Sequence, residues 1–243
     1  MLRYVFALVI YVFAILALFF YFSYRIAHQT EIVFVETLQG EKLHPHLWEE
    51  FELGSFTQKS IDVGRVRDRS YLRLTAAAEE THFPYRAFGI VTKEPVNYQK
   101  GLIIKYRVSF GKNVGISPPH SDLFVTPARN DVPLESGKWY QCTIRPYPQD
   151  PAYRMIELFF KDGKTVHLLH SSLVRSRLFP QWHEIQWLLS GEKIELEVDK
   201  TKHFVSLDQH AQFEKAFLYF LSSPHEANIP SELYYSRIMV SRW

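Results

Sequence analysis

Three acidic residues alternate along one short stretch of the sequence and could supply a pair of reacting carboxyl groups. Glu195, Glu197 and Asp199 occupy every second position of residues 195–199. Alternate residues of a β-strand share one face of a sheet. Hydrolysis of a glycosidic bond with retention of configuration needs two carboxyl groups about 5 to 5.5 Å apart. Glu195 and Glu197 are therefore candidate catalytic residues, although we favour the alternative that they form an ordinary solvated strand face.

Other side chains could bind a ligand without reacting with it. Lys105 and Arg107 fall on the polar face of an alternating stretch, where they could bind a carboxylated or sulfated glycan or simply face water. Tyr85 and Arg86, at the start of another strand-like stretch, are further candidates. A groove shared by some of these residues and Glu197 would indicate a binding site.

Two more candidates lie in a polar segment, and a third is a tryptophan. His120 and Asp122 belong to residues 117–133, which we interpret as a long turn of mixed polarity able to line a site. Trp187 is expected to be exposed, because a flat ring with a polar edge suits the face of a sugar. These residues complete the set of ligand-binding candidates.

The sequence lacks the signals of metal, nucleotide and serine chemistry. Its histidine pairs have no third ligand at a spacing typical of a metal site. No phosphate loop, dinucleotide fingerprint or serine-hydrolase elbow occurs. Cys142 is the one cysteine and lies in the alternating stretch WYQCTIR, so we expect a small core residue. We therefore predict no metal and no cofactor.

Residues 4–24 are uncharged and strongly apolar, between Arg3 and Arg25. A helix of this length covers about 30 Å, the thickness of the hydrocarbon core of a bilayer. A cleaved signal peptide has a shorter apolar stretch, and a buried core helix would have a polar face. We predict a single-pass signal anchor that contacts the lipid bilayer, with the rest of the chain on the extracytoplasmic side of the membrane.

The remainder of the chain has the pattern of an all-β domain. Two-residue alternation recurs between turn signals, most clearly at residues 102–110, 155–161 and 193–199. Helical periods are nearly absent, although short helical turns are expected near 171–178 and 209–214. This pattern predicts a two-sheet antiparallel β-sandwich of jelly-roll type.

The net charge of the chain bears on its partners, and its composition suggests how it divides into segments. The formal net charge is +2, from 28 basic and 26 acidic residues, which disfavours a nucleic-acid partner. We divide the chain into a short tail at 1–3, the anchor at 4–24, a partly ordered linker at 25–45 and one sandwich at 46–243.

The order of these strands resembles that of the concanavalin A-like lectin/glucanase superfamily, including its laminin G-like and keto-disaccharide hydrolase-like members. A tryptophan followed by a strand and a tight turn occurs twice, and two further strands follow. Two upstream segments, 85–93 and 98–107, resemble the paired strands that open such folds. The motifs are GKWY at 137–140, IELF at 156–159, DG at 162–163, WHEI at 182–185, KIELEVD at 193–199, AFLYF at 216–220 and YSRIMV at 235–240.

The resemblance implies a sandwich that handles carbohydrate. In the glucanases of this superfamily the acidic motif lies on an earlier strand and has Asp between two Glu residues, an arrangement that this sequence lacks. We therefore expect a membrane-anchored, non-catalytic binding domain for a saccharide or a cell-envelope partner. The alternatives are a hydrolase that acts on glycosidic bonds through Glu195 and Glu197, and a structural module that binds another protein.

Overall fold

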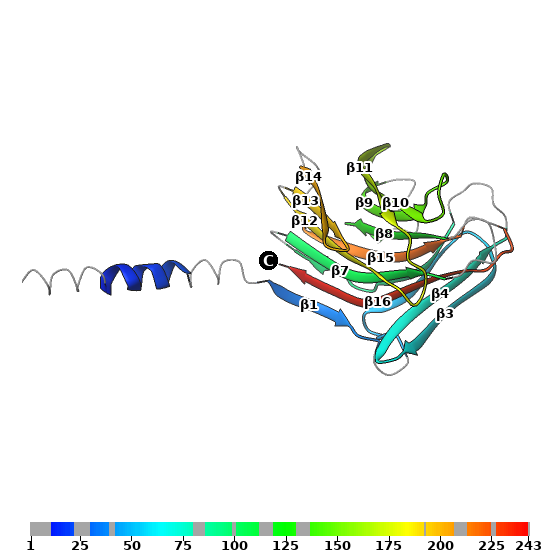
Figure 1. Cartoon of the computed structure of the whole chain (residues 1–243), viewed down its shortest axis with the longest axis horizontal. Coiled ribbons are helices and arrows are strands. Elements are labelled where there is room, and N and C mark those ends of the chain that lie inside the picture. The colour runs from blue at the N-terminus through cyan, green and yellow to red at the C-terminus, as the bar shows by residue number, and fades with distance from the viewer. Residues whose placement is uncertain are drawn as a thin grey trace, which may run out of the picture.

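The computed structural model describes residues 11–21, 30–38, 42–79, 86–98, 101–111, 119–129, 137–191, 193–206, 213–224 and 227–242. Within these ranges the strands form two antiparallel sheets (Figure 1). Sheet A has the order β14-β13-β12-β7-β16-β4-β3, and β1 also pairs with β16. Sheet B has the order β11-β10-β9-β8-β15-β5-β2, and β6 also pairs with β15. The prediction of an all-β, two-sheet antiparallel sandwich is confirmed.

Sheet A consists of β1 (Glu31–Glu36), β3 (Phe56–Val66), β4 (Arg69–Ala78), β7 (Gly101–Phe110), β12 (His183–Ser190), β13 (Lys193–Val198), β14 (Thr201–Ser206) and β16 (Ser231–Arg242). Sheet B consists of β2 (Trp48–Leu53), β5 (Ala87–Thr92), β6 (Val96–Asn97), β8 (His120–Thr126), β9 (Gly137–Pro146), β10 (Tyr153–Gly163), β11 (Thr165–Arg175) and β15 (Lys215–Ser223).

Alternation places one face of each strand in the core between the sheets. On β7 the even-numbered residues, from Leu102 to Phe110, are buried, whereas Lys105 and Arg107 are partly exposed on the outer face. On the facing sheet, Cys142 of β9 is fully buried, as predicted. Burial of such apolar rows contributes about 25 cal/mol for each Å² removed from water, which stabilises the two-layer arrangement.

Two strands, β1 and β4, pair with different halves of β16, and this arrangement positions the candidate site. The second half of β16 pairs with β1, from Ile238 to Arg242, and the first half pairs with β4, from Ser231 to Tyr235. Between the two halves the register with β7 shifts, and Arg237 adopts a left-handed backbone with φ 52°. A bulge of this kind redirects side chains and bends the strand.

Three predictions about segments are corrected by these elements. The presumed linker at 25–45 contains β1, so the sandwich begins before residue 46. The presumed long turn at 117–133 contains β8, an interior strand of sheet B. The helical turn expected at 171–178 is replaced by β11, which stays extended to Arg175 because it pairs with β10. Of the second expected helical turn, residues 209–212 lie outside the described residues.

Residues 11–21 form a helix, blue in Figure 1, whose apolar side chains are exposed. Residues 4–10 and 22–24 of the predicted anchor lie outside the described residues. Among the helices of the described part of the chain, none has both the length and the apolar character that a membrane span requires.

Candidate functional site

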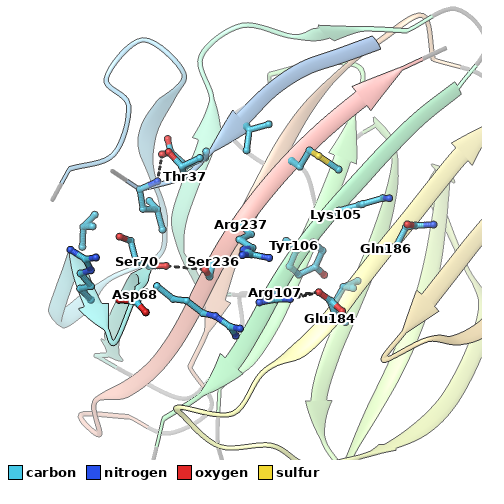
Figure 2. A pocket seen from close by; sticks show the side chains of 18 of the residues that line it. Thr37, Asp68, Ser70, Lys105, Tyr106, Arg107, Glu184, Gln186, Ser236 and Arg237 are labelled. Carbon is cyan, nitrogen blue, oxygen red and sulfur yellow. Dashed lines mark hydrogen bonds and ion pairs between the residues drawn. The ribbon is translucent and has the colours of Figure 1, made fainter. Parts of the chain in front are cut away.

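The outer face of sheet A contains a hollow of about 1120 Å³, which we call the basic hollow (Figure 2). Its floor comes from β7, β12 and the bulge of β16. Its walls come from the end of β1, residues 35–38, and from the hairpin of β3 and β4 around residues 63–70. Binding pockets for small molecules have volumes of about 300 to 1000 Å³, so this hollow is large enough for a saccharide.

Charged side chains dominate the lining of the basic hollow. The positive ones come from four separate parts of sheet A and outnumber the negative ones. The positive side chains are those of Arg65, Arg69, Lys105, Arg107, Lys200 and Arg237. The negative side chains are those of Glu36, Asp68, Glu184 and Glu197.

Arg107 and Glu184 form an ion pair across β7 and β12, which are paired in register at these two residues. Arg107 donates from Nε at 3.0 Å and from Nη2 at 2.5 Å to the same oxygen of Glu184. This hydrogen bond from Arg107 lowers the pKa of Glu184, which stays charged at neutral pH. The pair fixes the guanidinium over the sheet, where Figure 2 shows it beside Arg237.

Glu36 holds one wall of the hollow in place. The carboxylate is 4% exposed and accepts hydrogen bonds from the backbone N–H of Leu38 at 2.8 Å and from the Nε1–H of Trp48 at 3.0 Å. It also accepts one from the backbone N–H of His44 at 3.2 Å. Since its oxygens accept hydrogen bonds from the protein, Glu36 acts as a structural residue.

The two catalytic candidates lie on the outer face of sheet A but in different surroundings. Glu197 lines the basic hollow, whereas Glu195 is ion-paired with Lys202 at 3.0 Å and with Lys193 at 3.3 Å. The hydrogen bond from Lys202, followed by that from Lys193, lowers the pKa of Glu195. A general acid for glycoside hydrolysis needs a raised pKa. This geometry therefore disfavours Glu195 as the general acid of such a pair.

Asp122 lies on the outer face of sheet B, away from the basic hollow. It is fully buried and accepts hydrogen bonds from Gln141 at 2.9 Å, Thr143 at 2.6 Å and Ser223 at 2.6 Å. Buried aromatic rings occupy the neighbouring positions on this face, among them Phe124, Trp139 and Tyr219. The face combines polar and aromatic groups that are buried.

The structure brings together some of the candidate residues and separates others. Lys105, Arg107 and Glu197 line one hollow, as expected for a shared groove. His120 lies on β8 beside Asp122, across the sandwich from these residues. Arg86 donates to the backbone oxygen of Ser55 at 3.1 Å, outside the hollow. Tyr85 lies outside the described residues.

The expectation that Trp187 is exposed is wrong, because the residue is 0% exposed. It shares the inward face of β12 with Ile185 and Leu189, which belong to the same core cluster. Conversely, no local pattern points to Arg237 or Lys200 as residues of a site. For the wall of the hollow, residues 65–69 read RVRDR, and this local concentration of charge is a signal that the sequence offers. The bulge that carries Arg237 has no such signal.

No family model and no curated protein sequence matches the chain. Solved structures do match over most of its length. A glycoside hydrolase family 16 enzyme of Bacteroides ovatus, solved with an oligosaccharide product, has a TM-score of 0.63 at 12% identity and covers 86% of this chain and 100% of its own. The laminarinase catalytic domain of Thermotoga petrophila has a TM-score of 0.59 at 13% identity, with coverages of 88% and 98%.

The carbohydrate recognition domain of Emp47p is also similar, with a TM-score of 0.58 at 11% identity and coverages of 84% and 92%. At these identities the similarity concerns the fold alone. The fold is therefore the concanavalin A-like jelly-roll sandwich, which confirms that part of the resemblance drawn from the sequence.

Proposed function

We propose that this protein is a membrane-anchored domain that binds a saccharide in the basic hollow. The observation that carries the proposal is the position of Lys105, Arg107 and Glu197 around one open hollow of about 1120 Å³ on the outer face of sheet A. Donors and acceptors for sugar hydroxyl groups are present there, since Ser70 and Gln186 also line it. Among the structural neighbours, a glycoside hydrolase solved with an oligosaccharide product and a carbohydrate recognition domain support the same class of ligand.

The anchor is part of the proposal. Residues 4–24 would span the bilayer and hold the sandwich close to it. Apolar side chains of the described helix, such as Phe13 and Phe20, are 70% and 68% exposed and need an apolar environment. From residue 24 to residue 35 the chain reaches at most about 40 Å, so the hollow would face ligands near the membrane surface.

Binding is tested with the full chain in nanodiscs. We expect measurable affinity for members of a glycan array, and we expect Lys105→Gln to weaken the binding of a hit. The conservative control is Lys164→Gln in the turn between β10 and β11, which removes the same charge far from the hollow. A chain that binds no saccharide, or whose binding is equally affected by both changes, would contradict the proposal.

The anchor is tested by extraction of membranes at alkaline pH. We expect the full chain to stay with the lipid fraction and a chain without residues 1–24 to be released. If the full chain is itself released, the anchor is wrong, whatever the result of the glycan array.

We propose that binding occurs without catalysis, because Glu195 is paired with two lysines. The double change Glu195→Gln and Glu197→Gln separates the two possibilities. If the parent chain cleaves a polysaccharide and the double variant does not, the hydrolase alternative is correct. We expect no cleavage by either protein.

A further inference from the structure

The positive charge of the basic hollow is mostly unpaired. Within the described part of the chain, five of its cationic side chains have no carboxylate oxygen within 4.0 Å, and only Arg107 is ion-paired. The five are Arg65, Arg69, Lys105, Lys200 and Arg237. Like charges that converge on one concave surface repel one another unless an anion lies between them, so the hollow is suited to a negatively charged ligand.

Arg107 retains an unused donor at the floor of the hollow. Its Nε and Nη2 atoms serve Glu184, while Nη1 is buried and has no hydrogen-bond partner. A buried donor without a partner costs about 1 to 3 kcal/mol. The Arg107 side chain as a whole is 18% exposed, and an anionic ligand oxygen that contacts its guanidinium would form a charge-assisted hydrogen bond.

The backbone conformation at Arg237 sets the direction of its side chain. Its left-handed conformation, with φ 52°, occurs in the bulge where β16 changes register against β7. The residue before the bulge, Ser236, is paired with Arg107, and Met239 after it is paired with Lys105. Three cationic side chains therefore lie at neighbouring positions on two adjacent strands, and Figure 2 shows them on the same face.

The uncharged part of the lining argues against a neutral ligand. Neutral sugars are usually held by stacking on an exposed aromatic ring. Tyr106 is the one aromatic among the described residues that line the hollow, and it is 1% exposed because its ring packs in the core against Phe220 and Tyr235. The hollow offers charge and hydrogen bonds in place of a stacking surface.

We infer that the basic hollow selects an acidic saccharide, whose carboxylate or sulfate groups contact Arg107, Arg237 and Lys105. This inference rests on the proposed saccharide-binding function and adds the chemical class of the ligand. Ser70, Ser236 and Gln186 would serve the hydroxyl groups of the same sugar units. Carboxylate and sulfate groups both present anionic oxygens to a binding site. The experiment below distinguishes between the two groups.

The test measures the binding of three tetrasaccharides to the full chain in nanodiscs of zwitterionic phosphatidylcholine. They are a galacturonic acid tetramer, a chondroitin sulfate tetrasaccharide and cellotetraose, which carry carboxylates, sulfates with carboxylates, and no charge. We expect at least about tenfold tighter binding of one or both acidic ligands than of cellotetraose. We also expect this binding to weaken when NaCl is raised from about 0.05 M to about 0.5 M.

The variant Arg237→Asn removes the charge while keeping a residue that tolerates the left-handed backbone, so folding is not at risk. We expect it to weaken acidic-ligand binding by about tenfold and to leave cellotetraose unchanged. Lys164→Gln is again the control for lost charge, and we expect it to leave the binding of all three tetrasaccharides unchanged.

The possible failures are distinguishable. Binding of neutral sugars with no preference for acidic ones would overturn this inference and leave the proposed function standing. Absence of binding to all three tetrasaccharides and to the glycan array would overturn both. If vesicles that contain phosphatidylglycerol bind through Arg237 while the acidic tetrasaccharides do not, the hollow recognises lipid headgroups and the inference is wrong.

Discussion

Thr143 donates a hydrogen bond of 2.6 Å to Asp122, its partner in register on the neighbouring strand of sheet B. Gln141 donates to the same oxygen of Asp122, and Ser223 donates to the other. The carboxylate is thus a hub that joins β8, β9 and β15 on the outer face of the sheet. Because Asp122 is 0% exposed, water cannot take the place of its carboxylate as the acceptor of these hydrogen bonds.

Replacing Asp122 with Ala removes the carboxylate that accepts hydrogen bonds from three buried side chains, although Gln141 keeps its hydrogen bond to Thr143 at 2.7 Å. We expect the free energy of unfolding to fall by about 3 kcal/mol, because each unsatisfied buried group costs about 1 to 3 kcal/mol and the relaxation of neighbours offsets part of the sum. Thermal denaturation of the full chain in detergent measures the change. Ser223→Ala removes one donor and is expected to cost about 1 kcal/mol. Equal stability of Asp122→Ala and the parent would show that the hub does not stabilise the sheet.

Gly89 cannot carry a side chain. A Cβ atom at this position would lie 2.1 Å from the backbone oxygen of Phe220 on the neighbouring strand. We expect Gly89→Ala to cost about 3 kcal/mol or more, because the strands β5 and β15 would have to separate. In a protein of this size the melting temperature would fall by about 6 °C or more. Gly163→Asn is the control, since a Cβ there meets nothing within 4 Å and Asn tolerates a positive φ. A fully stable Gly89→Ala would refute the close contact.

Histidines between and within the sheets make stability depend on pH. His170 and His203 lie 3.1 Å apart between Nε2 and Nδ1, where burial lowers the pKa of both side chains. Burial also lowers the pKa of His183, although Asp199 partly opposes this. When the pH falls below the ordinary histidine value of 6.5, the unfolded chain takes up protons before the folded one does. The stabilisation is therefore complete above pH 6.5 and is lost progressively below it.

We expect the melting temperature of the full chain to fall between about pH 7.5 and about pH 5.5, and the double variant His170→Gln, His203→Gln to show a smaller fall. His46→Gln is the control for the loss of a histidine at an exposed position. An unchanged slope in the double variant would exclude the histidine pair as its cause.

Cys142 should be chemically inert in the folded protein. The residue is 0% exposed, and burial raises the pKa of its thiol to about 12, so almost no thiolate is present at neutral pH. We expect no reaction with a thiol reagent such as dithionitrobenzoate until the chain is unfolded, and one thiol per chain afterwards. Rapid labelling of the native protein would mean that β9 opens readily.

Local pattern was sufficient where apolar and polar residues alternate clearly along a strand. Residues 102–110 and 193–199 alternate clearly, and β7 and β13 are found there. The sequence predicts a turn where β8 lies, because residues 121–126 are buried on both faces and the alternation is lost there. Trp187 could have been placed correctly, since it has the same parity as Ile185 and Leu189 on an alternating strand.

By itself, the sequence determined the fold class and the side of each regular strand that faces the core, because these depend on hydrophobic alternation between near neighbours. It also placed Lys105 and Arg107 on a solvent face. Only the tertiary structure decided that this face is hollow and that Arg237 points into the same space. Those features arise from pairing between β16, at the end of the chain, and β1, β4 and β7. The register between strands that are far apart in the sequence cannot be predicted from local sequence patterns.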